Sequence, residues 1–198
     1  MNTEEYKGYN IEIEQDTYPM SPREWDNLGK LALFHRRYDF PNDDNISQDE
    51  AREILLSPAY IAIPVYGYDH GSISIKATFS RSYPYNCPWD SGMLGIVYVH
   101  KDAIREEWKK ERISKELTRK VTQLLIGEVE TYNQYLTGDI WGYNAINEHG
   151  ESIGSCWGYY GDCETSGLLD DAKSEIDSDI SEREIEETEL INRALAFA

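Results

Sequence analysis

Two strand–turn–strand patterns, one near the middle of the chain and one in its last third, constrain the fold more than any other feature. Residues 60–66 and 72–79 are rich in β-branched and aromatic side chains, and a short turn at residues 69–71 lies between them. Residues 140–147 and 152–159 repeat this arrangement around a second turn that contains glycine. Turns of this kind join neighbouring antiparallel strands. The sequence therefore predicts two β-hairpins.

Three Ser-x-x-Glu segments mark expected helix starts, because each side chain of such a capping box accepts a hydrogen bond from the other residue's backbone N–H. Residues 21–24 are expected to open a short helix, residues 47–50 a second helix, and residues 181–184 a terminal helix that ends near Leu195. Apolar side chains at helical spacing predict a longer helix over residues 114–135.

These helices and strands follow one another without the regular alternation that is typical of a parallel sheet. We therefore expect an α+β fold with one mainly antiparallel sheet, helices packed on one of its faces and an acidic helical C-terminus. Pro64 cannot donate a backbone hydrogen bond, so its strand is expected at a sheet edge or with a bulge. Residues 1–173 are expected to form a single domain, and residues 174–198 an acidic helical C-terminal extension.

Negative charge dominates the surface chemistry of the chain. The 198 residues include 37 acidic and 19 basic side chains, a formal net charge of −18. Residues 101–120 hold eight of the basic side chains and five of the acidic ones, so the remaining residues carry a net charge of −21. Such a field repels nucleic acid and anionic membranes and attracts cationic surfaces. We expect no direct binding to nucleic acid and no membrane association.

The chain is expected in the cytoplasm, and more narrowly in the cytoplasm of a bacterial host. Its first residues are acidic where a secretory signal would be basic, and no apolar stretch approaches the length of a membrane span. Cys87, Cys156 and Cys163 are an odd number of cysteines without the spacing of a disulfide framework. Reduced thiols are therefore expected.

A small set of residues could support catalysis. His35, His70, Asp90 and Cys87 are of the types that serve as base, orienting group and nucleophile. Their spacing does not require them to meet, and His70 and His35 also suit a turn and a strand, respectively. The chain contains none of the common zinc, calcium or phosphate-binding motifs. We expect no metal and no cofactor, and a binding protein rather than an enzyme.

Aromatic and glycine residues cluster in the second expected hairpin, at residues 141–143 and 156–160. Cross-strand packing with a close approach of the backbone is one interpretation of this pattern. The alternative is an aromatic contact patch, because tyrosine and tryptophan are favoured as anchors in binding surfaces.

Six segments of the chain are specific as a group: residues 23–29 (REWDNLG), 35–38 (HRRY), 68–70 (YDH), 87–92 (CPWDSG), 135–139 (YLTGD) and 155–161 (SCWGYYG). Together they resemble a recurrent group of small phage and mobile-element proteins to which no established activity is attached. The resemblance covers most of the chain but not the part after about residue 178, and it implies a mobile-element origin. Interference with host defence is therefore the expected context, although the motifs are not those of the antirestriction protein family, which is likewise acidic.

The charge and the resemblance together predict an acidic anti-defence protein that acts as a DNA mimic. Such a protein would inhibit a host DNA-binding protein or nuclease, such as a restriction enzyme or CRISPR effector, by occupying its cationic groove. The expected partner-binding residues are the acidic side chains near the C-terminus. They are Asp170, Asp171, Glu175, Asp177, Asp179, Glu182, Glu184, Glu186, Glu187 and Glu189.

Two alternatives to mimicry follow from the same residues. One is a small enzyme that uses His35, His70 and Asp90. The other is a protein that sequesters a nucleotide ligand, in which Arg36 and Arg37 hold a phosphate and nearby aromatic rings stack on a base. A pocket that joins residues 35–38, 69–70 and 88–92 would favour these alternatives, whereas an outward stripe of acidic side chains would favour mimicry.

Overall fold

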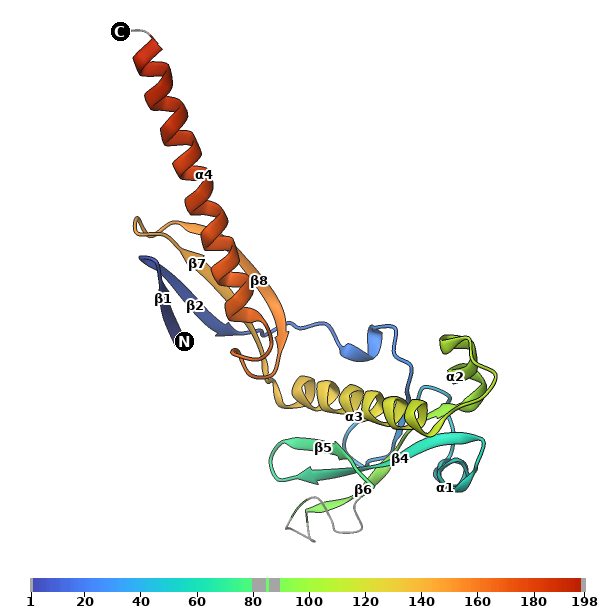
Figure 1. Ribbon diagram of the computed structural model, residues 1–198. Helices are drawn as coiled ribbons and strands as arrows, with labels where there is room; N and C mark the ends of the chain where they lie inside the picture. Colours follow the sequence, from blue (N-terminus) through green and yellow to red (C-terminus); the bar gives the residue numbers. More distant parts are fainter. Residues whose placement is uncertain (1, 80–84, 86–89, 197–198) are drawn as a thin grey trace. The chain divides into compact units, whose positions relative to one another are not determined.

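The chain divides into two compact units (Figure 1). The terminal unit contains Met1–Met20 and Gly138–Ala198, and the central unit contains Ser21–Thr137. Both units combine helices with antiparallel strands, which confirms the α+β class, but the strands form two four-stranded sheets instead of the one sheet that we expected. The structure is a computed structural model that describes residues 2–79, 85 and 90–196.

The terminal unit is an antiparallel sheet with one helix, α4, packed on it. Its strand order is β1-β2-β7-β8, so the second predicted hairpin is confirmed as β7–β8. The core between the sheet and α4 includes Ile11, Ile13, Tyr143, Ala172 and Ile176. The elements are β1 (Asn2–Tyr6), β2 (Tyr9–Gln15), β7 (Ile140–Ile146), β8 (Ser152–Tyr160) and α4 (Leu168–Ala196).

The division into units differs from the domain boundaries that we expected. Strand β2 pairs with β7, although the whole central unit separates these strands in the sequence. The two ends of the chain therefore contribute to one sheet. The expected boundary between residues 173 and 174 lies inside α4, which is continuous because Leu168, Ala172 and Ile176 place one apolar face on the sheet. The acidic C-terminal helix is present, but its first turns belong to the core of the terminal unit.

The central unit is built on a sheet with strand order β3-β6-β4-β5, and β4–β5 is the first predicted hairpin. Helix α3 covers one face, where Val121, Leu125 and Val129 are fully buried, and Ala51 of helix α1 packs on the opposite face. Helices therefore lie on both faces of this sheet. The elements are η1 (Pro22–Glu24), β3 (Lys30–Leu33), α1 (Gln48–Leu56), β4 (Tyr60–Asp69), β5 (Ile73–Ala77), β6 (Ser91–His100), α2 (Lys101–Trp108) and α3 (Lys115–Thr137).

The three expected helix starts have three different outcomes. Ser47 and Glu50 form a complete capping box at the start of α1, as predicted. Ser21 caps only the 3-10 turn η1, because Trp25 returns to an extended backbone. Ser181 lies within α4, where its hydroxyl donates to the carbonyl of Asp177, so this expected start was wrong.

Pro64 lies in an inner strand, so the expectation of an edge strand was wrong. Strand β4 pairs with β6 on one side and with β5 on the other. The register of the β4–β6 pairing shifts between Val65 and Tyr66, where β6 contains one extra residue, Leu94. The irregularity therefore lies on the partner strand, and the expected bulge in the strand of Pro64 is not found. Pairing with β5 begins at Val65, so the chain needs no donor from Pro64.

Candidate functional site

The acidic charge of the protein is concentrated in the terminal unit. This unit contains 20 acidic and four basic side chains, a net charge of −16, whereas the central unit contains 17 and 15, a net charge of −2. One folded module therefore carries nearly all of the net charge of −18.

Tyrosine hydroxyls from the sheet bind carboxylates of α4, so part of the expected acidic surface is engaged inside the unit. The distance from hydroxyl oxygen to carboxylate oxygen is 2.7 Å in two pairs, 2.8 Å in a third and 3.3 Å in a fourth. These bonds fix four of the ten expected partner-binding residues against the sheet. The pairs are Tyr9–Asp179, Tyr143–Glu175, Tyr159–Asp171 and Tyr6–Asp177.

The tyrosine–carboxylate bonds also change how these groups titrate. The hydrogen bond to Asp179 raises the pKa of Tyr9, and burial, together with Glu175, raises the pKa of Tyr143. Lys7 lies 2.7 Å from Asp177 and lowers the pKa of this carboxyl group. The carboxylates therefore favour protonated tyrosines, and they attach α4 to β1, β2, β7 and β8.

The other six expected partner-binding residues are exposed on α4. Asp170 lies near its start, and five glutamates lie in the segment from Ser181 onward, which we call the distal segment of α4 (residues 181–196). This segment continues beyond the strands of its own sheet (Figure 1). Its exposed glutamates are Glu182, Glu184, Glu186, Glu187 and Glu189, and its large exposed apolar side chains are Ile185, Leu190, Ile191 and Leu195.

The aromatic cluster of the second hairpin divides between the two faces of the sheet. Tyr143 and Tyr159 pack under α4, as cross-strand packing predicts. Trp157 is 48% exposed. A Cβ atom on Gly142 would lie 2.3 Å from Cε3 of Trp157, so the tight approach of the backbone to an aromatic ring is present here.

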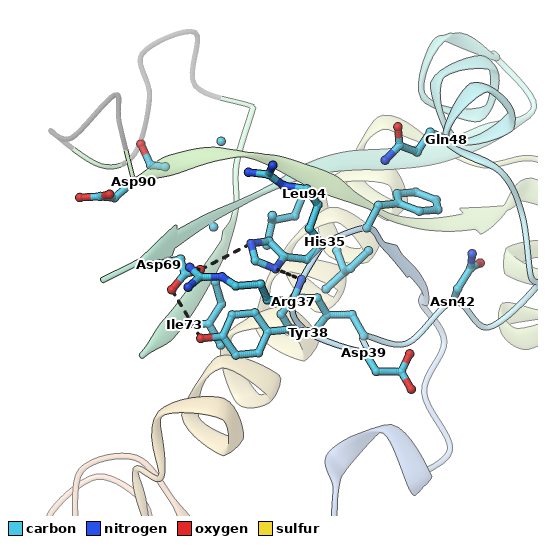
Figure 2. Close-up of a pocket in the computed structure, with 17 residues that line it drawn as sticks. His35, Arg37, Tyr38, Asp39, Asn42, Gln48, Asp69, Ile73, Asp90 and Leu94 are labelled. Atoms are coloured by element: carbon cyan, nitrogen blue, oxygen red, sulfur yellow. Dashed lines mark hydrogen bonds and ion pairs between the residues drawn. The ribbon is translucent and has the colours of Figure 1, made fainter. Parts of the chain in front are cut away.

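A pocket in the central unit joins the segments that could support ligand binding or catalysis. The cavity has a volume of about 1090 Å³, and its lining includes residues 35–38, Asp69 and residues 90–92. Figure 2 shows His35, Arg37 and Tyr38 near Asp69, with Asp90 at another part of the wall. The three segments therefore meet in space, although they lie far apart in the sequence.

Asp69, at the end of β4, is the centre of the polar network in this pocket. Its side chain is 11% exposed and pairs with the guanidinium of Arg37. Nε2 of His35 lies 3.6 Å from Oδ2 of Asp69, and the hydroxyl of Tyr38 lies 3.4 Å from Oδ1. The backbone N–H of Asp69 donates to the carbonyl of Asp90 at 2.8 Å, which links the network to the start of β6.

The candidate catalytic residues do not form one site: His70 pairs with Asp90, whereas His35 pairs with Asp69, which was not a candidate. Nδ1 of His35 accepts a hydrogen bond from the backbone N–H of Arg37 at 3.1 Å, so the proton of the neutral ring lies on Nε2, facing Asp69. Both nitrogens are thus engaged, which disfavours His35 as a general base. Nδ1 of His70 instead lies 3.4 Å from Oδ2 of Asp90. Cys87, the candidate nucleophile, lies outside the described residues.

Sequence reasoning placed Asp90 in the candidate site and did not include Asp69. The available signal was the position of Asp69 in the predicted turn at residues 69–71, directly before the candidate His70. Its relation to His35 and Arg37 depends on the pairing of β3 and β4 with the same strand, β6, which the sequence pattern did not predict.

Among the described residues, no cluster of three or more His, Cys, Asp or Glu side chains could hold a metal ion. In the same part of the chain, no helix has the length and apolar character required to cross a membrane. Cys156 and Cys163 are free thiols.

No protein-family model, curated protein or solved structure matches the chain. The relation to phage and mobile-element proteins therefore stays a prediction.

Proposed function

We propose that the terminal unit is an acidic binding module that inhibits a host defence nuclease by occupying its DNA-binding surface. The observation that supports this proposal is the net charge of −16 carried by Met1–Met20 and Gly138–Ala198. Duplex DNA presents one negative charge per about 1.7 Å of its axis, and nucleases bind it through clustered cations. A folded module with this net charge attracts the same cationic side chains of the nuclease through its electric field.

The distal segment of α4 gives this module a surface for close contact. Its five glutamates are exposed, and only Arg183 and Arg193 carry positive charge in residues 181–196. Leu190 and Ile191, 64% and 53% exposed, add apolar area beside the charges. Such a surface combines steering by charge with burial of side chains at the contact.

The first prediction concerns these five glutamates. Replacing Glu182, Glu184, Glu186, Glu187 and Glu189 with glutamine should lower the association rate with the target nuclease at least about tenfold, because steered association depends on the local field. The fold should be retained, since these side chains lie beyond the tyrosine–carboxylate bonds. Stopped-flow binding at several salt concentrations measures the effect, and the variant should show a flatter salt dependence.

A matched variant separates local charge from net charge. Five exposed glutamates of the central unit, replaced with glutamine, give the same net charge while leaving the distal segment intact, and should have little effect. They are Glu53, Glu106, Glu107, Glu116 and Glu130. Equal loss of binding in both variants would contradict the assignment to α4.

Competition with DNA tests the mechanism itself. A labelled duplex should leave the nuclease as the protein is added at equal stoichiometry, and added salt should weaken the inhibition. A ternary complex with unchanged DNA affinity would exclude mimicry. Inhibition far below one protein per target would instead favour an enzyme, with His70 and Asp90 as the first residues to replace.

The pocket of the central unit favours a second function, binding of a nucleotide or a similar anionic ring compound. Arg36 lines the cavity, is exposed and has no ion-pair partner among the described residues. Beside it, the rings of His35, Tyr38 and Phe40 lie with centroids 5.0 to 6.2 Å apart. A cation next to an aromatic surface suits a ligand that combines a phosphate with a base.

The second prediction follows from this pocket. Arg36→Gln should weaken nucleotide binding about tenfold, because a charge-assisted hydrogen bond contributes about 1.5–3 kcal/mol. Isothermal titration calorimetry with a panel of nucleotides measures the affinity. Arg52→Gln, on the exposed surface of α1, is the matched control and should leave the affinity unchanged. Equal affinities in all three proteins would exclude the pocket as the binding site.

A further inference from the structure

Helix α4 covers one face of the sheet of the terminal unit, and no helix among the described residues of this unit covers the other face. Tyr9, Ile11 and Ile13 of β2 point toward α4, so the alternating residues between and after them point away from it. Glu12 and Glu14 therefore lie on the uncovered face. The register of β1 adds Glu5, which is paired with Asn10.

Trp157 lies on this uncovered face because of the β7–β8 register. Glu14 of β2 is paired with Gly142 of β7, and Gly142 is paired with Trp157 of β8. The three residues thus form one row across the sheet. Neighbouring strands lie about 4.8 Å apart. An indole that extends from β8 over Gly142 of β7 therefore approaches Glu14, which lies on the next strand, β2.

Gly142 determines how the indole is held. A Cβ atom at this position would lie 2.3 Å from Cε3 and 2.5 Å from Cδ2 of Trp157, so the ring rests directly on the glycine backbone. The residue remains 48% exposed. One surface of the indole is therefore supported by the sheet, while the remainder stays accessible to a partner.

The acidic side chains on the two faces differ in their partners. On the covered face, Oε1 of Glu4 lies 2.6 Å from Nζ of Lys173. Asp177 of α4 forms an ion pair with Lys7. On the uncovered face, Glu5, Glu12 and Glu14 have no ion pair or side-chain hydrogen bond within the described part of the chain. The charge on this face is therefore not neutralised by the protein itself.

We infer that the uncovered face binds an arginine side chain of a cationic protein partner, with the guanidinium against Trp157 and beside the carboxylate of Glu14. Tryptophan is the strongest of the aromatic residues in cation–π contacts. Guanidinium is planar and weakly hydrated, and it can stack on a ring while donating hydrogen bonds to a carboxylate in its own plane. A compact, strongly hydrated lysine ammonium fits this combination less well.

The inference rests on the proposed function for the identity of the partner, a protein with a cationic groove. It adds a second contact surface, separate from the distal segment of α4, and a preference for arginine over lysine. Both additions can be measured without a natural partner, using oligo-arginine and oligo-lysine peptides of equal length as probes.

The experiment compares variants of Trp157 and Glu14 in the full chain by titration with both peptides at low salt. Wild-type protein should bind oligo-arginine more tightly than oligo-lysine. Trp157→Ala should weaken oligo-arginine binding about fivefold and reduce the preference for arginine, since a cation–π contact at a partly exposed site has this magnitude. Glu14→Gln should also weaken binding of oligo-arginine.

Two matched controls and one conservative variant make the result specific. Tyr18→Ala removes another exposed aromatic ring of the same unit, and Glu164→Gln removes another exposed carboxylate; both should leave the arginine preference unchanged. Trp157→Phe keeps a ring over Gly142 and should retain part of the preference. Thermal unfolding checks that Trp157→Ala is folded, and Trp157→Phe provides the test if it is not.

The outcomes separate this inference from the proposed function. If neither Trp157 variant changes the affinity or the preference for arginine, or if Tyr18→Ala has an equal effect, the inference is overturned, whereas competition with duplex DNA still decides on mimicry. If Trp157 determines the arginine preference but the protein displaces duplex from none of the nucleases tested, the arginine site stands and mimicry fails.

Discussion

Glu128 of α3 joins the segment before β3 to the helix that covers its sheet. Its carboxylate accepts hydrogen bonds from the backbone N–H groups of Leu28 at 2.9 Å and Gly29 at 3.0 Å. Nη1 of Arg23 lies 4.0 Å away, and the side chains of Arg23 and Glu128 are only 10% and 12% exposed. A Cβ atom on Gly29 would lie 2.5 Å from Oε2, so glycine is required for this approach. The segment at residues 23–29 thus has a structural role.

The third prediction concerns this carboxylate. Glu128→Ala should lower the free energy of unfolding by about 2 kcal/mol or more, because two partly buried N–H groups lose their acceptor. Glu128→Gln keeps an acceptor oxygen and should cost less. Burial raises the pKa of Glu128 above its ordinary value of 4.5, so the folded state binds this proton more tightly than the unfolded state does. The contribution of this protonation to the free energy of unfolding is therefore complete below pH 4.5 and is lost as pH rises through the raised pKa. Urea unfolding at several pH values measures both effects; equal losses in the two variants would contradict the role as acceptor.

At the scale of elements, α4 is attached to its sheet by apolar packing and by the tyrosine–carboxylate bonds. The fourth prediction is a loss of stability in alkali. The folded-state pKa values of Tyr9, Tyr143 and Tyr159 lie above 10, so their contribution is complete below pH 10 and is lost as pH rises through the folded-state values. Each tyrosine-to-phenylalanine variant should lose about 1 kcal/mol at neutral pH. It should also show a smaller alkaline loss in urea unfolding.

Tyr18→Phe is the matched control for these variants, because Tyr18 is 94% exposed. Its unfolding should follow the wild-type protein at neutral and at alkaline pH. If it shifts as much as Tyr143→Phe, the alkaline effect is a general property of the charge and not of the bonds to α4.

The elements also show which parts of the fold the sequence could predict. Both predicted hairpins, α1 and α3 form where local patterns indicated them, because turn residues, Ser47 and apolar spacing act over a few residues. The hairpin β1–β2 was not predicted, although Ile11 and Ile13 alternate with polar residues. In the structure, its turn is formed by Lys7 and Gly8, which have positive φ angles of 50° and 83°. The Ser181 segment failed because a capping pattern inside an already formed helix does not start a new one.

At the scale of the whole molecule, the pairings that could not be predicted are the ones between distant segments. The partner of β2 is β7, and the partner of His35 is Asp69. Neither leaves a local pattern in the sequence, because each depends on the order of strands in a sheet. The charge was largely visible along the sequence, since residues 138–198 contain 15 acidic and three basic side chains. The pairing of β2 with β7 adds the acidic residues 1–20 to the same unit.

The fifth prediction is that residues 21–137 fold without the rest of the chain. The central unit is one continuous segment with its own buried core on both faces of its sheet. A fragment of these residues should unfold in a single cooperative transition in urea, with circular dichroism as the measurement. A fragment without a cooperative transition would show that this core needs the terminal unit.

The pairing of β2 with β7 has a consequence for biosynthesis. Ribosomes add about 5–20 residues per second, so β7 leaves the exit tunnel on the order of ten seconds after β2. The central unit emerges during this interval and is complete just before β7 follows, while Ile11 and Ile13 have neither β7 nor α4 to cover them. A two-stranded hairpin alone is at best marginally stable in water, so we expect β1 and β2 to become ordered only once β7 and α4 have emerged. Until then, we expect the like charges of Glu5, Glu12 and Glu14 to oppose association of this segment with other chains.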